Sequence, residues 1–90
     1  MKQIKMNVQG RVQGVAFRYM TKIVADTLNI DGYAKNLDDG SVEIMAQGTD
    51  ENIKSFINKV KASPSPQGRV DHYTLEEISG VTFGKGFRTL

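Results

Sequence analysis

The stretch that decides the fold runs from Lys2 to Leu28 and reads KQIKMNVQGRVQGVAFRYMTKIVADTL. Its first part alternates polar and apolar residues, which predicts a half-buried strand over residues 2–9. From Phe17 the apolar residues recur three and four positions apart, which predicts an amphipathic helix that ends near Asn29. A loop with two glycines, residues 10–16, separates the two periodicities and joins the strand to the helix.

The rest of the chain repeats the same two patterns. Asp38-Asp39-Gly40 is a tight hairpin signal. Asp50 is expected to cap a second helix, and the Ser-Pro segment over residues 63–68 is expected to end it. The further elements predicted in this way are strands over residues 31–37, 41–47, 69–77 and 83–90, and a helix whose apolar stripe covers residues 53–60.

The order of these elements is β-α-β-β-α-β with a short additional strand at the C-terminal end. Two helices covering one face of an antiparallel sheet would bury both helical stripes, so we expect a single α+β domain over residues 1–90. A strand, a crossover helix and a second strand in one sheet are expected to run parallel. The glycine loop and Lys35-Asn36, which follow or close these two strands, should therefore lie at the same end of the sheet.

The composition excludes several functional classes. The 90 residues include no cysteine, which rules out disulfides, thiolate metal sites and a cysteine nucleophile. The formal net charge of +2 is too small to indicate a nucleic-acid partner. The N-terminus has no apolar run typical of a signal peptide, and no stretch approaches the roughly 20 apolar residues that span a bilayer. We therefore expect a cytoplasmic protein with no nucleic-acid or membrane partner.

The glycine loop has the features of an anion-binding site. Glycines allow successive N–H groups to point into one concavity, and the first N–H groups of the following helix are unpaired. Arg18 lies in the first helical turn, where a cation is unfavourable unless an anion lies between it and the helix dipole. Its planar guanidinium can bind two phosphate oxygens. The residues alone are also compatible with two simpler interpretations. The loop could be an ordinary surface loop whose arginine packs on a carboxylate, and Asn36 could serve only to form the turn.

Two motifs resemble the signature of the acylphosphatase family. Residues 10–18 read GRVQGVAFR, and residues 32–36 read GYAKN after the predicted helix. The similarity continues through DGSVE at residues 39–43 and Arg69-Val70, so it covers essentially the whole chain. Ala16 and Thr89 depart from the usual pattern, and Thr89 is expected to affect packing and not chemistry.

The resemblance implies a ferredoxin-like sandwich that hydrolyses the carboxyl-phosphate bond of acyl phosphates by water attack on phosphorus. It implies that Arg18 binds the phosphoryl group and that Asn36 is the catalytic asparagine. An amide can aim a water but cannot act as a base at neutral pH, so the proton is expected to pass to the substrate phosphate. No metal and no cofactor are expected. Further donors are expected from the backbone of Arg11, Val12, Gln13, Gly14, Val15, Ala16 and Phe17.

The same topology also occurs in proteins that bind RNA. An RNA-binding module of the same topology would stack bases on aromatic residues of its central strands, and residues 4–8 and 42–46 contain none. The alternative is a non-catalytic domain that binds phosphate or carbamoyl phosphate. A further possibility is a domain that handles carbamoyl phosphate and is detached from a larger enzyme. The presence of both Arg18 and Asn36, in a chain that starts at Met1, favours a free-standing enzyme. A monomer is favoured because no long apolar surface stripe remains unassigned.

Overall fold

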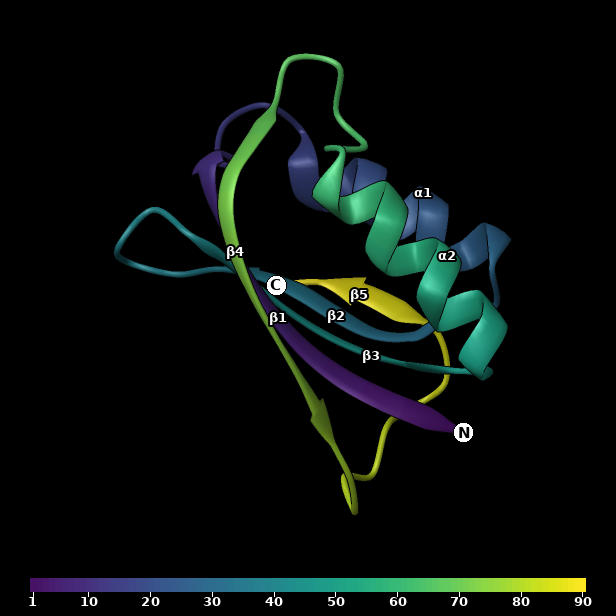
Figure 1. The fold of residues 1–90 in the computed structure, drawn as a ribbon. Helices are drawn as coiled ribbons and strands as arrows, with labels where there is room; N and C mark the ends of the chain where they lie inside the picture. Colours follow the sequence, from purple (N-terminus) through teal and green to yellow (C-terminus); the bar gives the residue numbers. More distant parts are fainter.

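The computed structural model describes all residues of the chain and contains two helices and five strands in the predicted order (Figure 1). The helices begin and end close to the positions that their apolar stripes predicted. The observed elements are β1 (Lys2–Arg11), α1 (Phe17–Thr27), β2 (Asp31–Asn36), β3 (Val42–Gly48), α2 (Asp50–Lys61), β4 (Arg69–Ile78) and β5 (Phe87–Thr89).

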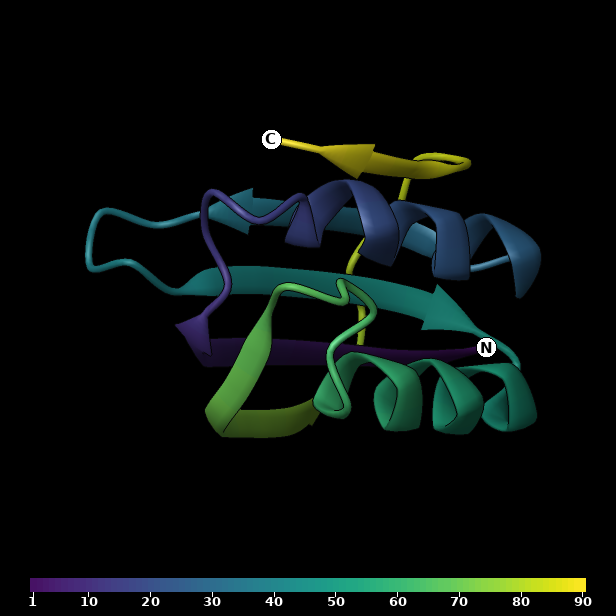
Figure 2. The ribbon, with the colours of Figure 1, turned by 90° about the horizontal axis from the view of Figure 1, so that it is seen from above.

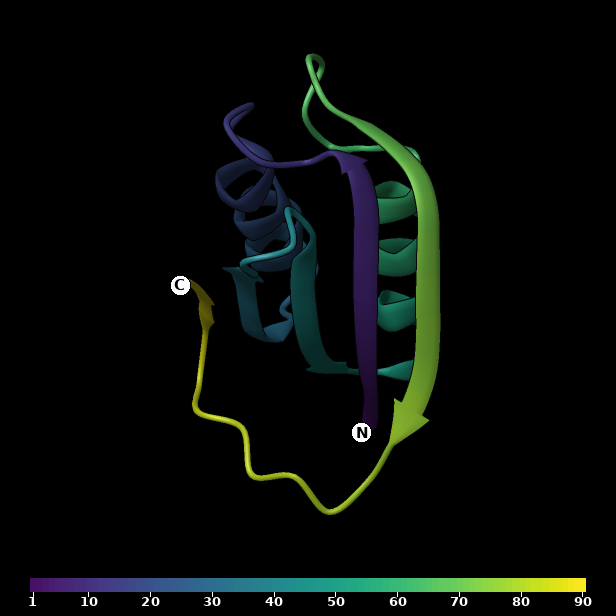
Figure 3. The same cartoon turned by 90° about the vertical axis from the view of Figure 1, so that its left-hand side faces the viewer.

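The strands form one sheet in the order β4-β1-β3-β2-β5. Strand β3 pairs antiparallel with both β1 and β2, so β1 and β2 run parallel to each other, as the topology predicted. Both helices lie on the same face of the sheet, which Figures 2 and 3 show from two directions. Figure 2 also shows the 10–16 loop and the turn after β2 at one end of the sheet. The arrangement is the ferredoxin-like sandwich that the sequence predicted.

The hydrophobic core fills the space between the helices and the sheet. The strands supply alternate side chains, including Ile4 of β1 and Ile44 of β3, which are almost completely buried. The helices contribute Phe17 and Phe56 from their apolar stripes. Phe87 of β5 packs on Phe56, with ring centroids 5.9 Å apart, and this contact attaches the short C-terminal strand to the core.

Three local expectations need correction. The strand expected over residues 83–90 is limited to β5 (Phe87–Thr89), and residues 83–86 belong to no strand. Thr49, and not Asp50, caps α2, because the Thr49 hydroxyl accepts the N–H of Asn52 at 3.1 Å while Asp50 is already helical. Strand β5 pairs with β2 in parallel, so the sheet is mixed and not purely antiparallel. The chain reaches this edge by crossing the whole width of the sheet from β4. Neither helix has the length and hydropathy that a membrane-spanning helix requires.

Gly32 of β2 provides a test of the sheet geometry. Its φ of +145° is unfavourable for other residues, and a Cβ added there would lie 1.8 Å from the main-chain oxygen of Met45 on β3. Gly32→Ala should therefore lower the free energy of unfolding by more than about 2 kcal/mol, measured by urea titration. Gly84→Ala is the matched control, because its added Cβ would meet nothing within 4 Å. Equal stabilities of the two variants would contradict the β2–β3 packing described above.

Candidate active site

The structure brings Arg18 and Asn36 into one hollow at the end of the sheet where β1 and β2 finish. This placement agrees with the prediction from topology, which used only the parallel course of the two strands. The hollow holds about 450 Å³ of empty space, part of it open to solvent. The residues that line it are Val12, Gly14, Ala16, Phe17, Arg18, Tyr19, Asn36 and Thr89.

The loop offers a series of free N–H donors. No main-chain N–H group from Val12 to Tyr19 donates a hydrogen bond to an acceptor in the chain. The N-cap residue of α1, Ala16, gives no side-chain cap, and the first helical turn has no acidic residue. The positive end of the helix dipole is therefore uncompensated by the protein, which favours an anion there.

The loop reaches this shape through two left-handed residues. Gly14 has a φ of +76° and Ala16 a φ of +60°. The second conformation has a steric cost for alanine that glycine would avoid, because alanine carries a Cβ. Alanine still allows the turn, and its exposed side chain leaves the N–H groups accessible.

Leu90, far from Arg18 in the sequence, holds the Arg18 side chain in place. The Nη1 of Arg18 donates to the main-chain oxygen of Leu90 at 2.7 Å, across a sequence separation of 72 residues. The N–H of Asn36 contacts the same oxygen at 3.4 Å. The remaining guanidinium N–H groups of Arg18 have no partner in the chain and stay available to a ligand.

The Asn36 side chain makes no hydrogen bond, and its Oδ1 atom is buried without a donor. An unpaired buried amide is unfavourable, and groups of this kind in native proteins usually serve a ligand or a reaction. Because neither end of the amide is bonded, a 180° rotation of the amide breaks no hydrogen bond. The side chain can therefore present either its oxygen or its nitrogen to the hollow.

Gln13 connects the loop to the turn that follows Asn36. Its Nε2 donates to the main-chain oxygens of Leu37 at 2.8 Å and Ser41 at 2.9 Å. We call this pair of bonds the Gln13 latch. It spans the two segments that carry the predicted site residues, so it fixes the distance between the N–H donors of the loop and the amide of Asn36.

The turn itself is rigid because its side chains bond one another. Asp39 Oδ1 accepts the hydroxyl of Ser41 at 2.6 Å and the N–H of Ser41 at 3.0 Å, and both bonds lower the pKa of Asp39 below its ordinary value. Asn7 of β1 donates to the same Ser41 hydroxyl at 2.9 Å. Since Asp39 is stabilised as the carboxylate, its contribution to stability is lost as the pH falls through that lowered pKa.

The other residues predicted for the site play different parts. Val12, Val15 and Phe17 bury their side chains and leave only their backbone to the loop, while Arg11 is exposed at the end of β1. Ser65, from the Ser-Pro segment, donates its hydroxyl to the main-chain oxygen of Val15 and so supports the loop from behind.

Sequence reasoning missed two residues that line the hollow, and a third that binds Arg18. Thr89 was expected to affect packing alone, yet it lines the hollow, and Tyr19, which no sequence motif singled out, is exposed beside it. Leu90 contributes through its main-chain oxygen, which has no signal in the sequence. His, Asp and Glu side chains nowhere form a group of three that could hold a metal ion.

Comparisons with known proteins identify close relatives. The family model for acylphosphatase matches residues 4–89. An acylphosphatase of Enterococcus faecalis is 54% identical over 77 residues, which is 86% of this chain and 85% of the relative, and one of Pediococcus pentosaceus is 53% identical over 78 residues, 87% of each chain. The crystal structure of an acylphosphatase from Bacillus subtilis superimposes with a TM-score of 0.94 at 38% identity, covering 100% of this chain and 99% of that one.

The Gln13 latch can be tested by its effect on stability. Gln13→Leu removes two donors while keeping a similar volume, and it should lower the free energy of unfolding by about 1–2 kcal/mol in urea titrations. Gln67→Leu serves as the control, because Gln67 is exposed in the Ser-Pro segment. If the two variants were equally stable, the latch would contribute nothing to the geometry of the site.

Proposed function

This chain belongs to the acylphosphatase family and hydrolyses the carboxyl-phosphate bond of acyl phosphates, and we propose that Arg18 and Asn36 perform this reaction. The observation that carries the proposal is the meeting, in one hollow, of an arginine, a series of free N–H donors and an unpaired amide. Each of these groups lacks a partner that an acyl phosphate and a water would supply.

The phosphoryl group is held by the loop and Arg18. Its nonbridging oxygens accept hydrogen bonds from the free N–H groups between Val12 and Tyr19. The guanidinium of Arg18 binds two of these oxygens. In the transition state, charge spreads over these oxygens while the bond to the leaving group breaks. Donors that are already in place stabilise this charge without reorganisation, which is the largest contribution that such a site can make.

Asn36 places the attacking water. Its amide oxygen accepts one proton of the water while its nitrogen donates to a phosphoryl oxygen, which aligns the water with phosphorus. The new P–O bond forms from the water as the P–O bond to the carboxylate breaks. The leaving carboxylate is stable as an anion and needs no proton. The proton of the water passes to a phosphate oxygen, because an amide cannot accept it.

The domain organisation, oligomeric state, partners and location of the enzyme belong to the same proposal. We infer that residues 1–90 form one domain that acts as a monomer on small-molecule acyl phosphates in the cytoplasm, with no nucleic-acid or membrane partner. The modest net charge and the two non-spanning helices support this setting. The alternative, a domain that binds phosphate or carbamoyl phosphate without catalysis, predicts a folded chain with ligand affinity and no turnover.

Substitution of Arg18 tests the binding of the phosphoryl group. Arg18→Gln should lower kcat/KM for benzoyl phosphate by at least about 100-fold, the scale on which loss of a preorganised donor acts. Arg18→Lys should fail similarly, because an ammonium cannot bind two oxygens in the planar geometry. Lys22→Gln, one turn further along α1, controls for the loss of a charge and should keep the wild-type rate. An active Arg18→Lys enzyme would contradict bidentate binding.

Substitution of Asn36 tests the position of the water and the activity together. Benzoyl phosphate hydrolysis is measured in buffer with chelator, which should leave the wild-type rate unchanged. Asn36→Ala should lower kcat by about 100-fold or more, while the affinity for inorganic phosphate and the folding stability stay nearly intact, because the amide makes no hydrogen bond in the free protein. Full turnover by this variant would refute the role of Asn36, and an inactive wild type would favour the binding domain.

A further inference from the structure

The sheet face without helices carries a second hollow, which has no lining residue in common with the hollow of Arg18 and Asn36. The segment over residues 79–86 crosses this face on its way from β4 to β5, and Figure 2 shows it passing behind the strands. Gln3 holds the segment at one side, donating to the main-chain oxygen of Val81 and accepting its N–H. Asp31 holds it at the other, accepting the N–H of Gly86 at 2.8 Å.

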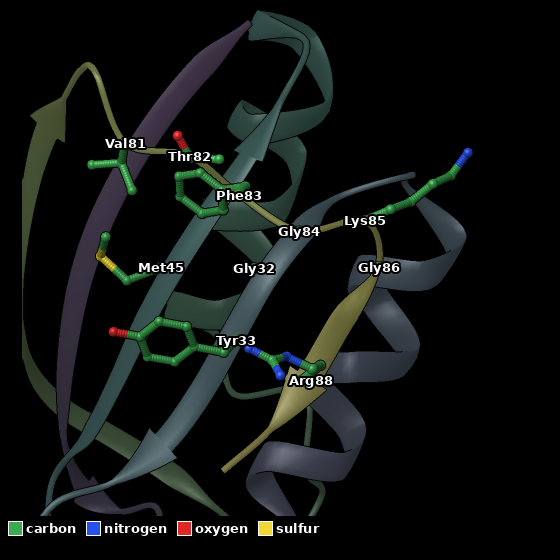
Figure 4. Close-up of a pocket in the computed structure, with 10 residues that line it drawn as sticks. All are labelled: Gly32, Tyr33, Met45, Val81, Thr82, Phe83, Gly84, Lys85, Gly86 and Arg88. Atoms are coloured by element: carbon green, nitrogen blue, oxygen red, sulfur yellow. The ribbon is translucent and has the colours of Figure 1, made fainter.

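Two aromatic rings line this hollow, which we call the open-face pocket (Figure 4). Tyr33 of β2 and Phe83 of the crossing segment project toward the same space, and Met45 of β3 lies beside them. Both rings are partly exposed, although packing inside a protein usually covers aromatic rings more fully. The pocket holds about 490 Å³ of empty space, part of it open to solvent, which is ample for one aromatic ring.

The pocket is electropositive on the side of β5. Arg88 lies directly opposite Tyr33 in the β2–β5 register, and its guanidinium makes neither an ion pair nor a hydrogen bond. Lys85 at the rim is also unpaired, and its side chain extends outward. The main-chain N–H groups of residues 82–85 have no acceptor in the chain either.

The carboxylates near this pocket are already engaged. Glu43 accepts the Tyr33 hydroxyl at 2.8 Å and pairs with Lys5 at 3.7 Å, and Asp31 holds Gly86 as described above. Burial, together with the hydrogen bond to Glu43 and its charge, raises the pKa of Tyr33 to about 12. The Tyr33 phenol is uncharged near pH 7, as it would also be at its ordinary pKa.

We propose that the open-face pocket binds a planar aromatic carboxylate, with its ring between Tyr33 and Phe83 and its carboxylate on Arg88. Stacking between two rings suits a planar group, and the planar guanidinium of Arg88 matches a carboxylate with two parallel hydrogen bonds. The free N–H groups of residues 82–85 supply additional donors. The site is separate from the hollow of Arg18, since the two share no lining residue.

Titration of the 15N-labelled chain with benzoate, followed by amide shifts, tests the proposal. Saturable shifts should appear at residues 82–88 and at Tyr33, with a Kd in the low-millimolar range or tighter. Benzamide, which lacks the charge, and acetate, which lacks the ring, should each bind at least about tenfold more weakly. A parallel titration with inorganic phosphate marks the Arg18 hollow independently. Benzoate shifts confined to residues 12–18 and Asn36, or no saturable shifts at all, would overturn the proposal.

One pair of variants distinguishes binding in the open-face pocket from nonspecific electrostatic attraction of benzoate to a positively charged protein. Arg88→Gln should weaken benzoate binding at least about tenfold and leave the spectrum of the free protein folded, because Arg88 makes no contact that the fold requires. Lys54→Gln removes the same charge from α2 on the other side of the sheet and should leave the affinity unchanged. Equal loss in both variants would show that net charge, and not the pocket, attracts the ligand.

Discussion

The position of β3 between β1 and β2 is the constraint on which the rest of the structure depends. Because β3 pairs antiparallel with both neighbours, β1 and β2 run parallel and finish at the same end of the sheet. The loop before α1 and Asn36 must then meet there. The core strengthens this constraint, since Ile44 and Ala46 of β3 are completely buried under the helices. A shift of one residue in the register would turn these side chains to the open face.

Polar contacts fix the position of the 10–16 loop relative to the turn that follows Asn36. The Gln13 latch joins the loop to the turn after Asn36, and the Ser41–Asp39 bonds hold that turn rigid. From the other side, Leu90 places its main-chain oxygen against Arg18. Arg18 keeps its other guanidinium N–H groups free, and neither the loop N–H groups from Val12 to Tyr19 nor the side-chain amide of Asn36 has a partner in the chain. The loop and the turn are thus held by bonds to the rest of the chain, while the N–H donors of the loop and the amide of Asn36 are left for a ligand.

The two faces of the sheet have different physical characters, and this separates the two sites. Alternate residues of β1 and β3, together with Ala34 of β2, are buried beneath the helices, and the residues between them form an open face of polar side chains, Tyr33 and Met45. Only the crossing segment over residues 79–86 covers part of that face. Its attachment through Gln3 and Asp31 brings Phe83 over the strands without closing the space beside Tyr33.

The sequence by itself determined the elements, their order and the two residues that the hollow brings together. Periodicity of two and of 3.6 residues is a local property, and right-handed parallel crossovers leave few topologies, so Arg18 and Asn36 could be placed at one end of the sheet. Even local signals failed where neighbours compete, as Thr49 and Asp50 do for the cap of α2, because both residue types cap helices and only the backbone conformation, extended at Thr49 and helical at Asp50, distinguishes them. Only the tertiary structure decided that β5 runs parallel to β2, that Thr89 and Tyr19 line the hollow, and that Gln13 bonds the far turn. These features depend on contacts between residues that are far apart in sequence, such as the bond between Arg18 and Leu90, which are separated by 72 positions. A main-chain acceptor such as the oxygen of Leu90 is present in every residue, so the sequence does not indicate which one is used.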